Sequence, residues 1–193
     1  MNRLEATRVV VAAAGDAPIV ASLGHPAYDL FAAGDRPQNF YTWGSMGMAS
    51  SIGLGLALAK PEARIFVVDG DGALLMNLGS LATIGLLGPP NLVVVVMDNG
   101  AFATTGGQSS PTAHGADLEA AARAMGVDAA TARTEDDLRA LVSGARRAPL
   151  VAVAKVSESA PTVRPPLDCV FIKQRFMAAI GNPESAAHPA GRA

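Results

Sequence analysis

The sequence has little cysteine, few aromatic residues and almost no net charge. Its single cysteine, Cys169, excludes a disulfide within the chain and fits a reducing compartment. Aromatic residues make up 5% of the chain and the formal net charge is −2, so stacking platforms and a basic field are both missing. Because nucleic acids and anionic membranes recruit proteins through such features, we expect neither as a partner.

Long apolar runs are also missing, because glycine, proline or charged residues interrupt them. We therefore expect no transmembrane helix. We find no basic-then-apolar leader before a cleavage site, so the cytoplasm is the expected location. Half of the 193 residues are nevertheless hydrophobic, which suits one globular domain with a sizeable core.

Short apolar runs alternate with helical patterns along most of the chain. The runs predict strands at 19–22, 40–43, 65–68, 92–97, 127–131 and 150–156. The other patterns predict helices at 3–14, 27–33, 45–59, 74–87, 116–125 and 134–146, and a long polar loop at 100–115. This alternation predicts an α/β fold, with a parallel sheet covered by helices on both faces.

The composition changes after the last predicted strand. Residues 1–156 are expected to form the main domain. Residues 157–181 are expected to hold a proline-rich linker and a docking helix near 167–180. The Pro/Ala/Gly-rich residues 182–193 are expected to be a disordered tail.

An acidic, glycine-bracketed turn, Gly70-Asp71-Gly72, follows the third predicted strand. Twenty-five residues separate Gly72 from Asp98, which is room for a helix and a return in a right-handed strand–helix–strand unit. Both strands would then end at one sheet edge, so Asp71 and Asn99 would meet in the crevice there. Two hard oxygen ligands suit Mg²⁺ bound to a phosphate-bearing ligand. The alternative is two turn residues that cap adjacent elements.

Several segments together resemble a known family. They are Gly70-Asp71-Gly72, Asp98-Asn99-Gly100-Ala101, residues 40–53, residues 77–85 and Gly106-Gly107-Gln108. Over roughly residues 15–156 the chain resembles the diphosphate-binding part of thiamine diphosphate-dependent 2-oxoacid decarboxylases, particularly those acting on sulfopyruvate and phosphonopyruvate. The resemblance implies thiamine diphosphate and Mg²⁺ as cofactors, both bound by the domain at 1–156.

The same resemblance implies which residues meet the metal and the diphosphate. Metal ligands would be Asp71, Asn99 and the backbone carbonyl of Ala101. The backbone around Gly70, Gly72 and Ala73 would meet the diphosphate at a helix N-terminus.

The other end of the cofactor would lie near the segment Gly44, Ser45, Met46 and Gly47. By the resemblance, the Gly44 carbonyl accepts a hydrogen bond from the 4′-amino group of the pyrimidine. Met46 would sit beneath the bent cofactor, a place that suits a bulky and adaptable apolar side chain. The alternative is an ordinary core methionine at a strand–helix junction.

Four polar residues are candidates for catalytic contact with a small anionic 2-oxoacid. They are His25, in a turn after the first strand, and Thr104, Thr105 and Gln108, on the loop after the metal motif. The alternatives are a capping or surface histidine and a loop that polar residues merely keep solvated.

One expected residue is missing. The family activates its cofactor with a glutamate from a pyrimidine-binding domain, and no second domain fits in this chain. The sequence places its glutamates in helices or loops away from the expected position: Glu5, Glu62, Glu119, Glu135, Glu158 and Glu184. The inference is a separate pyrimidine-binding alpha subunit that carries the activating glutamate.

The helix expected at 45–59 is crowded with small residues, including three glycines. Glycine costs a helix close to 1 kcal/mol relative to alanine, so the glycines need an explanation. We expect close approach to the cofactor at one end and to another subunit along the length. The sequence therefore predicts self-association, at least to a dimer.

The function that the resemblance implies is decarboxylation of 3-sulfopyruvate to sulfoacetaldehyde and CO₂ by a heteromeric enzyme, with this chain as its beta subunit. Phosphonopyruvate or another 2-oxoacid is the alternative, because Phe102-Ala103 stands where sulfopyruvate enzymes tend to have Tyr-Gly. The His-Asp pair common in phosphonopyruvate enzymes is also absent here. A cofactor-binding regulatory subunit without catalysis is the alternative of a different class.

Overall fold

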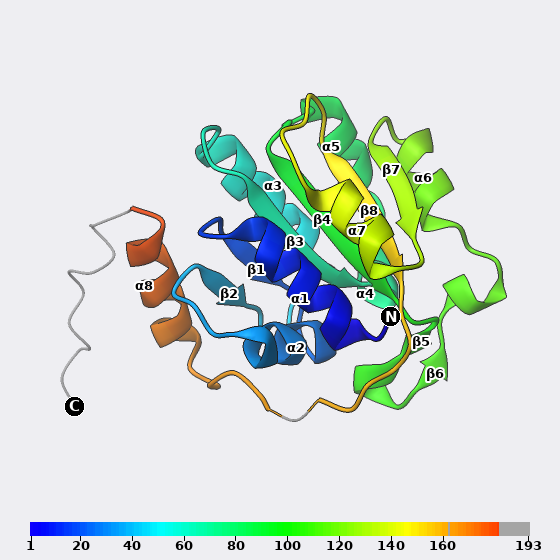
Figure 1. Cartoon of the computed structure of the whole chain (residues 1–193), viewed down its shortest axis with the longest axis horizontal. Coiled ribbons are helices and arrows are strands. Elements are labelled where there is room, and N and C mark those ends of the chain that lie inside the picture. The colour runs from blue at the N-terminus through cyan, green and yellow to red at the C-terminus, as the bar shows by residue number, and fades with distance from the viewer. Residues whose placement is uncertain (162, 182–193) are drawn as a thin grey trace.

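A sheet of six parallel strands forms the centre of the structure, in the order β2-β1-β3-β4-β8-β7 (Figure 1). The computed structural model describes residues 1–161 and 163–181, so the tail expected at 182–193 lies outside the described residues. The strands are β1 Ile19–Ala21, β2 Asn39–Tyr41, β3 Ile65–Gly70, β4 Leu92–Asp98, β7 Asp128–Ala132 and β8 Leu150–Lys155. The predicted α/β class with a parallel sheet is confirmed.

Helices cover both faces of the sheet, and each face has its own apolar core (Figure 1). One face carries α1 Arg3–Ala14, α2 His25–Ala33 and α7 Glu135–Val142, and the other carries α3 Ala49–Ala59, α5 Ser80–Leu87 and α6 Leu118–Ala124. Along β3, Phe66 and Val68 pack into the first core while Ile65 and Val67 pack into the second. Burial on both sides explains why the strand is continuously apolar.

Two predicted helices have different bounds in the structure. The helix expected at 45–59 begins only at Ala49, because Gly44, Ser45 and Gly47 have φ angles of 71°, 55° and 85°. Positive φ angles are incompatible with a right-handed helix. The helix expected at 74–87 is two helices, α4 Asp71–Met76 and α5, and the chain between them is not helical.

The loop expected at 100–115 has structure of its own. A short antiparallel hairpin pairs β5 Ala101–Phe102 with β6 Gln108–Ser109. Two 3₁₀ turns, η1 Ala103–Thr105 and η2 Pro111–His114, complete the segment. The hairpin lies below the carboxyl end of β4 in Figure 1, so the segment stands beside the sheet edge where the sequence places the metal.

The C-terminal helix α8 Cys169–Ala179 packs beside the edge strand β2. The ring of Phe176 lies 5.2 Å from that of Phe40, and Arg175 donates hydrogen bonds to both oxygens of Asp35 at 2.6 and 3.0 Å. Within residues 1–161 and 163–181, every helix is too short or too polar to span a bilayer.

Two glycines of α3 predict opposite effects of alanine on stability. A Cβ on Gly53 would lie 2.2 Å from Cγ2 of Val67 on β3, whereas a Cβ on Gly55 would meet nothing within 4 Å. We expect Gly53→Ala to lower the free energy of unfolding by about 1–3 kcal/mol through overpacking. Gly55→Ala should raise it by about 0.5–1 kcal/mol through helix propensity. Urea titrations followed by circular dichroism measure both, and a Gly53→Ala chain as stable as the parent would contradict the close packing.

Candidate functional site

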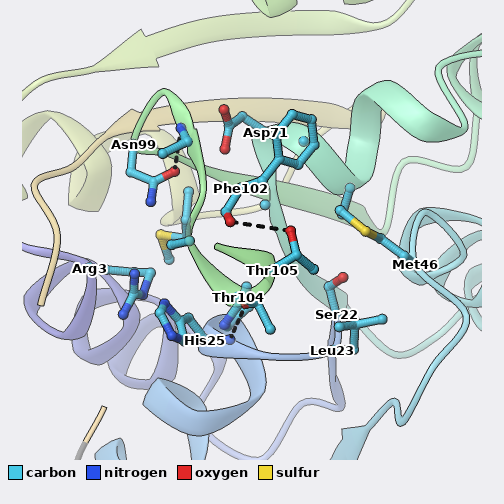
Figure 2. A pocket seen from close by; sticks show the side chains of 17 residues that line it. Arg3, Ser22, Leu23, His25, Met46, Asp71, Asn99, Phe102, Thr104 and Thr105 are labelled. Atoms are coloured by element: carbon cyan, nitrogen blue, oxygen red, sulfur yellow. Dashed lines mark hydrogen bonds between the residues drawn. The ribbon is translucent and has the colours of Figure 1, made fainter. Parts of the chain in front are cut away.

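A cavity opens at the carboxyl ends of β1, β3 and β4 (Figure 2). Because β1 pairs with β2 on one side and with β3 on the other, the strand order reverses here, and ligands of such sheets bind at this point. The lining residues come from distant segments: Arg3; Ser22, Leu23, His25 and Pro26; Met46; Gly70 to Ala73; Met97, Asn99 and Ala101 to Thr105.

Asp71, the first residue of α4, is almost fully buried, at 1% exposure. Its Oδ2 accepts hydrogen bonds from Ser110 Oγ and, at 2.8 Å, from Thr112 Oγ1. Burial raises the pKa of the Asp71 carboxyl above its usual range, and the two hydroxyls oppose that rise. No lysine or arginine of the described part forms an ion pair with Asp71. A buried carboxylate without a cation fits a site for a divalent metal.

Asn99 follows β4 and lines the same cavity as Asp71. Its Oδ1 accepts a hydrogen bond from the Ala101 N–H at 3.2 Å, and its amide nitrogen donates to Glu158. The chain after β8 returns across the metal end of the cavity and brings Glu158 there, which the sequence does not indicate. Asn99 and Met46 lie on opposite sides of the cavity, so Glu158 is far from the expected pyrimidine end (Figure 2).

The oxygen ligands that the cavity lining offers here are the Asp71 carboxylate, the Asn99 amide oxygen and the Ala101 carbonyl. These hard oxygens suit Mg²⁺, which keeps several waters and shares phosphate oxygens. No group of three His, Cys, Asp or Glu side chains among residues 1–161 and 163–181 is placed to hold a metal. A metal here would therefore take its remaining oxygens from water and a bound phosphate, which fits the diphosphate of the expected cofactor.

The two glycines that bracket Asp71 have different surroundings. A Cβ on Gly72 would lie 2.3 Å from Cε1 of Phe102, so only glycine admits the aromatic ring against the start of α4. A Cβ on Gly70 would meet nothing within 4 Å. Phe102 itself lines the cavity and faces Asp71 in Figure 2.

Met46 is held on a backbone of unusual conformation. The preceding Ser45 is the one non-glycine residue of the described chain with a positive φ. Asn77 lies in the short non-helical stretch between α4 and α5. Its side-chain amide donates to the Gly47 carbonyl at 3.0 Å and to the Ser51 hydroxyl at 3.1 Å. Left-handed non-glycine residues cost energy and cluster at functional sites, so the conformation of Ser45 marks this loop as a candidate wall of the site.

His25 and Thr104 meet across the cavity from Asp71 (Figure 2). The His25 backbone N–H donates to Thr104 Oγ1 at 3.3 Å. Burial, followed by the charge of Arg3, lowers the pKa of His25, so the ring is neutral at neutral pH. Arg3 is buried and paired with Asp29, which compensates its charge.

The structure brings most of the predicted site residues together. His25, Met46, Thr104, Thr105 and the whole diphosphate and metal set line the cavity. Four candidates do not line it: Gly44, Ser45 and Gly47 flank Met46 on its loop, and Gln108 lies on the exposed strand β6.

Several polar residues at the site were not among the predicted ones. They are Arg3, Ser22, Asn77, Ser110, Thr112 and Glu158. The polar composition of residues 100–115 indicates that Ser110 and Thr112 could take part in a site. No pattern in the sequence indicates that Arg3 or Glu158 reaches this edge of the sheet.

Residues 24–156 match the family described as "Thiamine pyrophosphate enzyme, C-terminal TPP binding domain". A parallel sheet with a crevice at its switch point, and Asp71 and Asn99 on that crevice, is the architecture expected of such a domain. The chain belongs to this family of thiamine pyrophosphate enzymes.

Its relatives include several decarboxylases. The chain is 39% identical to sulfopyruvate decarboxylase subunit beta of Methanocaldococcus jannaschii over 185 residues. This alignment covers 93% of this chain and 97% of that protein. The same subunit of Methanothermobacter thermautotrophicus is 46% identical over 138 residues, 72% of each chain. Phosphonopyruvate decarboxylase of Streptomyces viridochromogenes is 48% identical over 124 residues, which cover 64% of this chain but only 31% of that longer protein.

Solved structures share the fold at lower identity. A thiamine diphosphate-dependent 4-hydroxybenzoylformate decarboxylase from Rhodococcus jostii superposes with a TM-score of 0.69 at 18% identity, over 82% of this chain and 33% of that one. A thiamin diphosphate-dependent enzyme from Mycobacterium smegmatis gives 0.70 at 24% identity, over 82% and 32%. These likenesses support the fold.

Proposed function

We propose that this chain is the diphosphate-binding beta subunit of a heteromeric decarboxylase that converts 3-sulfopyruvate to sulfoacetaldehyde and CO₂. The observation that carries the proposal is the match over 97% of the length of a sulfopyruvate decarboxylase beta subunit. The cavity supports it, because Asp71 and Asn99 line one wall together. Thiamine diphosphate supplies the electron sink that cleavage of the carbon–carbon bond needs.

Each cavity residue then has a role that its surroundings support. Asp71, Asn99 and the Ala101 carbonyl hold Mg²⁺ against the diphosphate. Met46 supports the bend of the cofactor from its fixed loop. His25, as a neutral ring, orients the substrate or relays a proton without adding charge.

The activating glutamate belongs to a separate pyrimidine-binding alpha subunit. No glutamate of residues 1–161 and 163–181 lines the cavity, although Glu158 contacts two of the lining residues, Asn99 and Arg3. The name "subunit beta" of the relatives supports a two-subunit enzyme.

Self-association through one face of the sheet completes the proposed assembly. Large apolar side chains are exposed on the helices of that face: Leu58 of α3, Met76 of α4, and Leu86 and Leu87 of α5. Leu86 is 84% exposed. Apolar surface gathered on neighbouring helices marks an interface, and a second copy of the chain is the proposed occupant.

The substrate is tested on the assembled enzyme. CO₂ release from 3-sulfopyruvate, phosphonopyruvate and pyruvate is compared, and we expect the highest kcat/KM for 3-sulfopyruvate. Phosphonopyruvate is the second candidate, because the Streptomyces enzyme is 48% identical over its matching part. A higher kcat/KM for phosphonopyruvate would replace the substrate, and no turnover of any 2-oxoacid would favour a regulatory subunit.

Met46 is expected to matter for rate and not for folding. Met46→Ala should slow turnover by about 10–100-fold, because the cofactor loses the support that fixes its reactive geometry. The melting temperature should change little, because Met46 is only half-buried. Met125→Ala, at a half-buried methionine at the end of α6, is the matched control and should keep kcat. Native turnover by Met46→Ala would make Met46 an ordinary packing residue.

A further inference from the structure

Two hydroxyl residues on the segment after β6 contact the carboxylate of Asp71. Ser110 Oγ and Thr112 Oγ1 both donate to Oδ2, and they lie 2.8 Å from one another. Among the residues that the structure describes, no side chain donates to Oδ1 of Asp71. The two hydroxyls therefore hold one oxygen of the carboxylate, and in the described chain the other oxygen has no side-chain donor.

The hydroxyl of Thr112 has a choice of acceptors. Its oxygen lies 2.8 Å from Asp71 Oδ2 and 2.8 Å from Asp98 Oδ1, yet it carries a single proton. If Thr112 donated this proton to Asp98, the Thr112 oxygen would face Oδ2 of Asp71 with no proton between the two atoms. The partners of Asp98 therefore decide how Asp71 is held.

The Asp98 carboxylate has two other partners besides Thr112. Lys155, from the end of β8, forms an ion pair with its Oδ2, and the Gly100 N–H donates to its Oδ1 at 3.2 Å. Asp71 has no such cation among the described residues. The unneutralised carboxylate is the stronger acceptor, so the Thr112 proton goes to Asp71.

We propose that Ser110 and Thr112 are positioning residues for the metal: they hold Oδ2 of Asp71 so that Oδ1 faces Mg²⁺. The Asp98–Lys155 pair keeps Asp98 from competing for the Thr112 proton. This inference rests on the proposed cofactor site and adds to it two residues that touch neither metal nor cofactor. Hydrogen bonds to ligating carboxylates typically change metal affinity by about 10–100-fold.

The test measures metal binding directly in the enzyme assembled with its pyrimidine-binding partner. Mn²⁺ replaces Mg²⁺, and electron paramagnetic resonance counts free Mn²⁺ during a titration at saturating thiamine diphosphate. We expect Thr112→Val and Ser110→Ala each to weaken Mn²⁺ binding by about 10–100-fold. Thr112→Ser should restore it, and Ser109→Ala, at the exposed neighbouring position, should bind as the parent does.

Without metal and cofactor, the variants that lose affinity should still unfold in one cooperative transition, at a moderately lower melting temperature because the buried Asp71 carboxylate has lost a donor. A cooperative transition separates positioning from loss of the fold. If Thr112→Val does not fold, Ser110→Ala still decides, because it removes one oxygen from a fully buried site. Parent-like Mn²⁺ affinity in both variants would overturn the inference alone. A parent enzyme whose Mn²⁺ binding does not depend on thiamine diphosphate would instead overturn the proposed function.

Discussion

Replacing Asp71 by alanine is expected to abolish Mg²⁺-dependent binding of thiamine diphosphate in the assembled enzyme. Among the described residues, Asp71 is the one carboxylate that lines the cavity. No other lining side chain carries a negative charge with which to hold a divalent cation against a diphosphate. Isothermal titration calorimetry with and without Mg²⁺ measures the loss. Unchanged affinity in Asp71→Ala would remove the metal assignment.

A second substitution at Asp71 should weaken cofactor binding without lowering the stability of the chain that lacks metal. Asp71 is buried without a cation, and such a carboxylate costs the folded chain free energy until a metal binds. Asp71→Asn keeps the shape and removes the charge, so the chain without metal should be at least as stable as the parent. Mg²⁺ and thiamine diphosphate should then raise the melting temperature of the parent but not of the variant. Asp16→Asn, in an exposed turn before β1, is the matched control and should respond as the parent does.

The part of the site that the sequence predicts comes from two strands adjacent in the chain and in the sheet. Asp71 and Asn99 follow β3 and β4, which pair in parallel from Ile65 with Leu92 to Gly70 with Met97. Parallel pairing with a right-handed crossover places both strand ends at one edge, so spacing and apolar pattern were sufficient. The motif also lies where the strand order reverses, a place that topology alone favours for ligands.

The residues that hold these two ligands were beyond such reasoning. Ser110 and Thr112 reach Asp71 across 39 and 41 residues, and Glu158 reaches Asn99 across 59. Contacts of this kind depend on how the segment after β4 and the chain after β8 fold back over the sheet edge. Composition marks such segments as polar, but it does not say which hydroxyl meets which carboxylate.

Backbone conformation explains the other differences. The sequence pattern of residues 45–59 is helical, but Ser45 adopts a φ of 55° and the helix starts four residues later. Gly53, expected to serve an interface, instead lets α3 approach Val67 within the same chain. Local propensity predicts the helix, but the surrounding structure decides where it starts and what its glycines contact.

The chain alone is expected to have no decarboxylase activity, and activity is expected to appear when a pyrimidine-binding subunit is added. The cavity holds the metal and diphosphate side, but no glutamate of the described residues lines it. Loss of such an acid–base group costs about 10²–10⁴-fold in rate, and loss of the whole pyrimidine wall costs binding as well. A coupled CO₂-release assay with 3-sulfopyruvate compares the chain, the partner and their mixture.

Light scattering on the same samples tests the assembly. The purified chain should self-associate to at least a dimer, because Leu58, Leu86 and Leu87 are exposed on neighbouring helices of one face. Leu86→Glu with Leu87→Glu places charges on that face and should shift the chain toward monomer, whereas Val163→Glu, at an exposed position before α8, should not. A partner subunit whose activating glutamate is replaced by glutamine should form the complex and leave it inactive. A monodisperse monomer that turns over 3-sulfopyruvate unaided would contradict the two-subunit architecture, and with it the placement of the activating glutamate outside this chain.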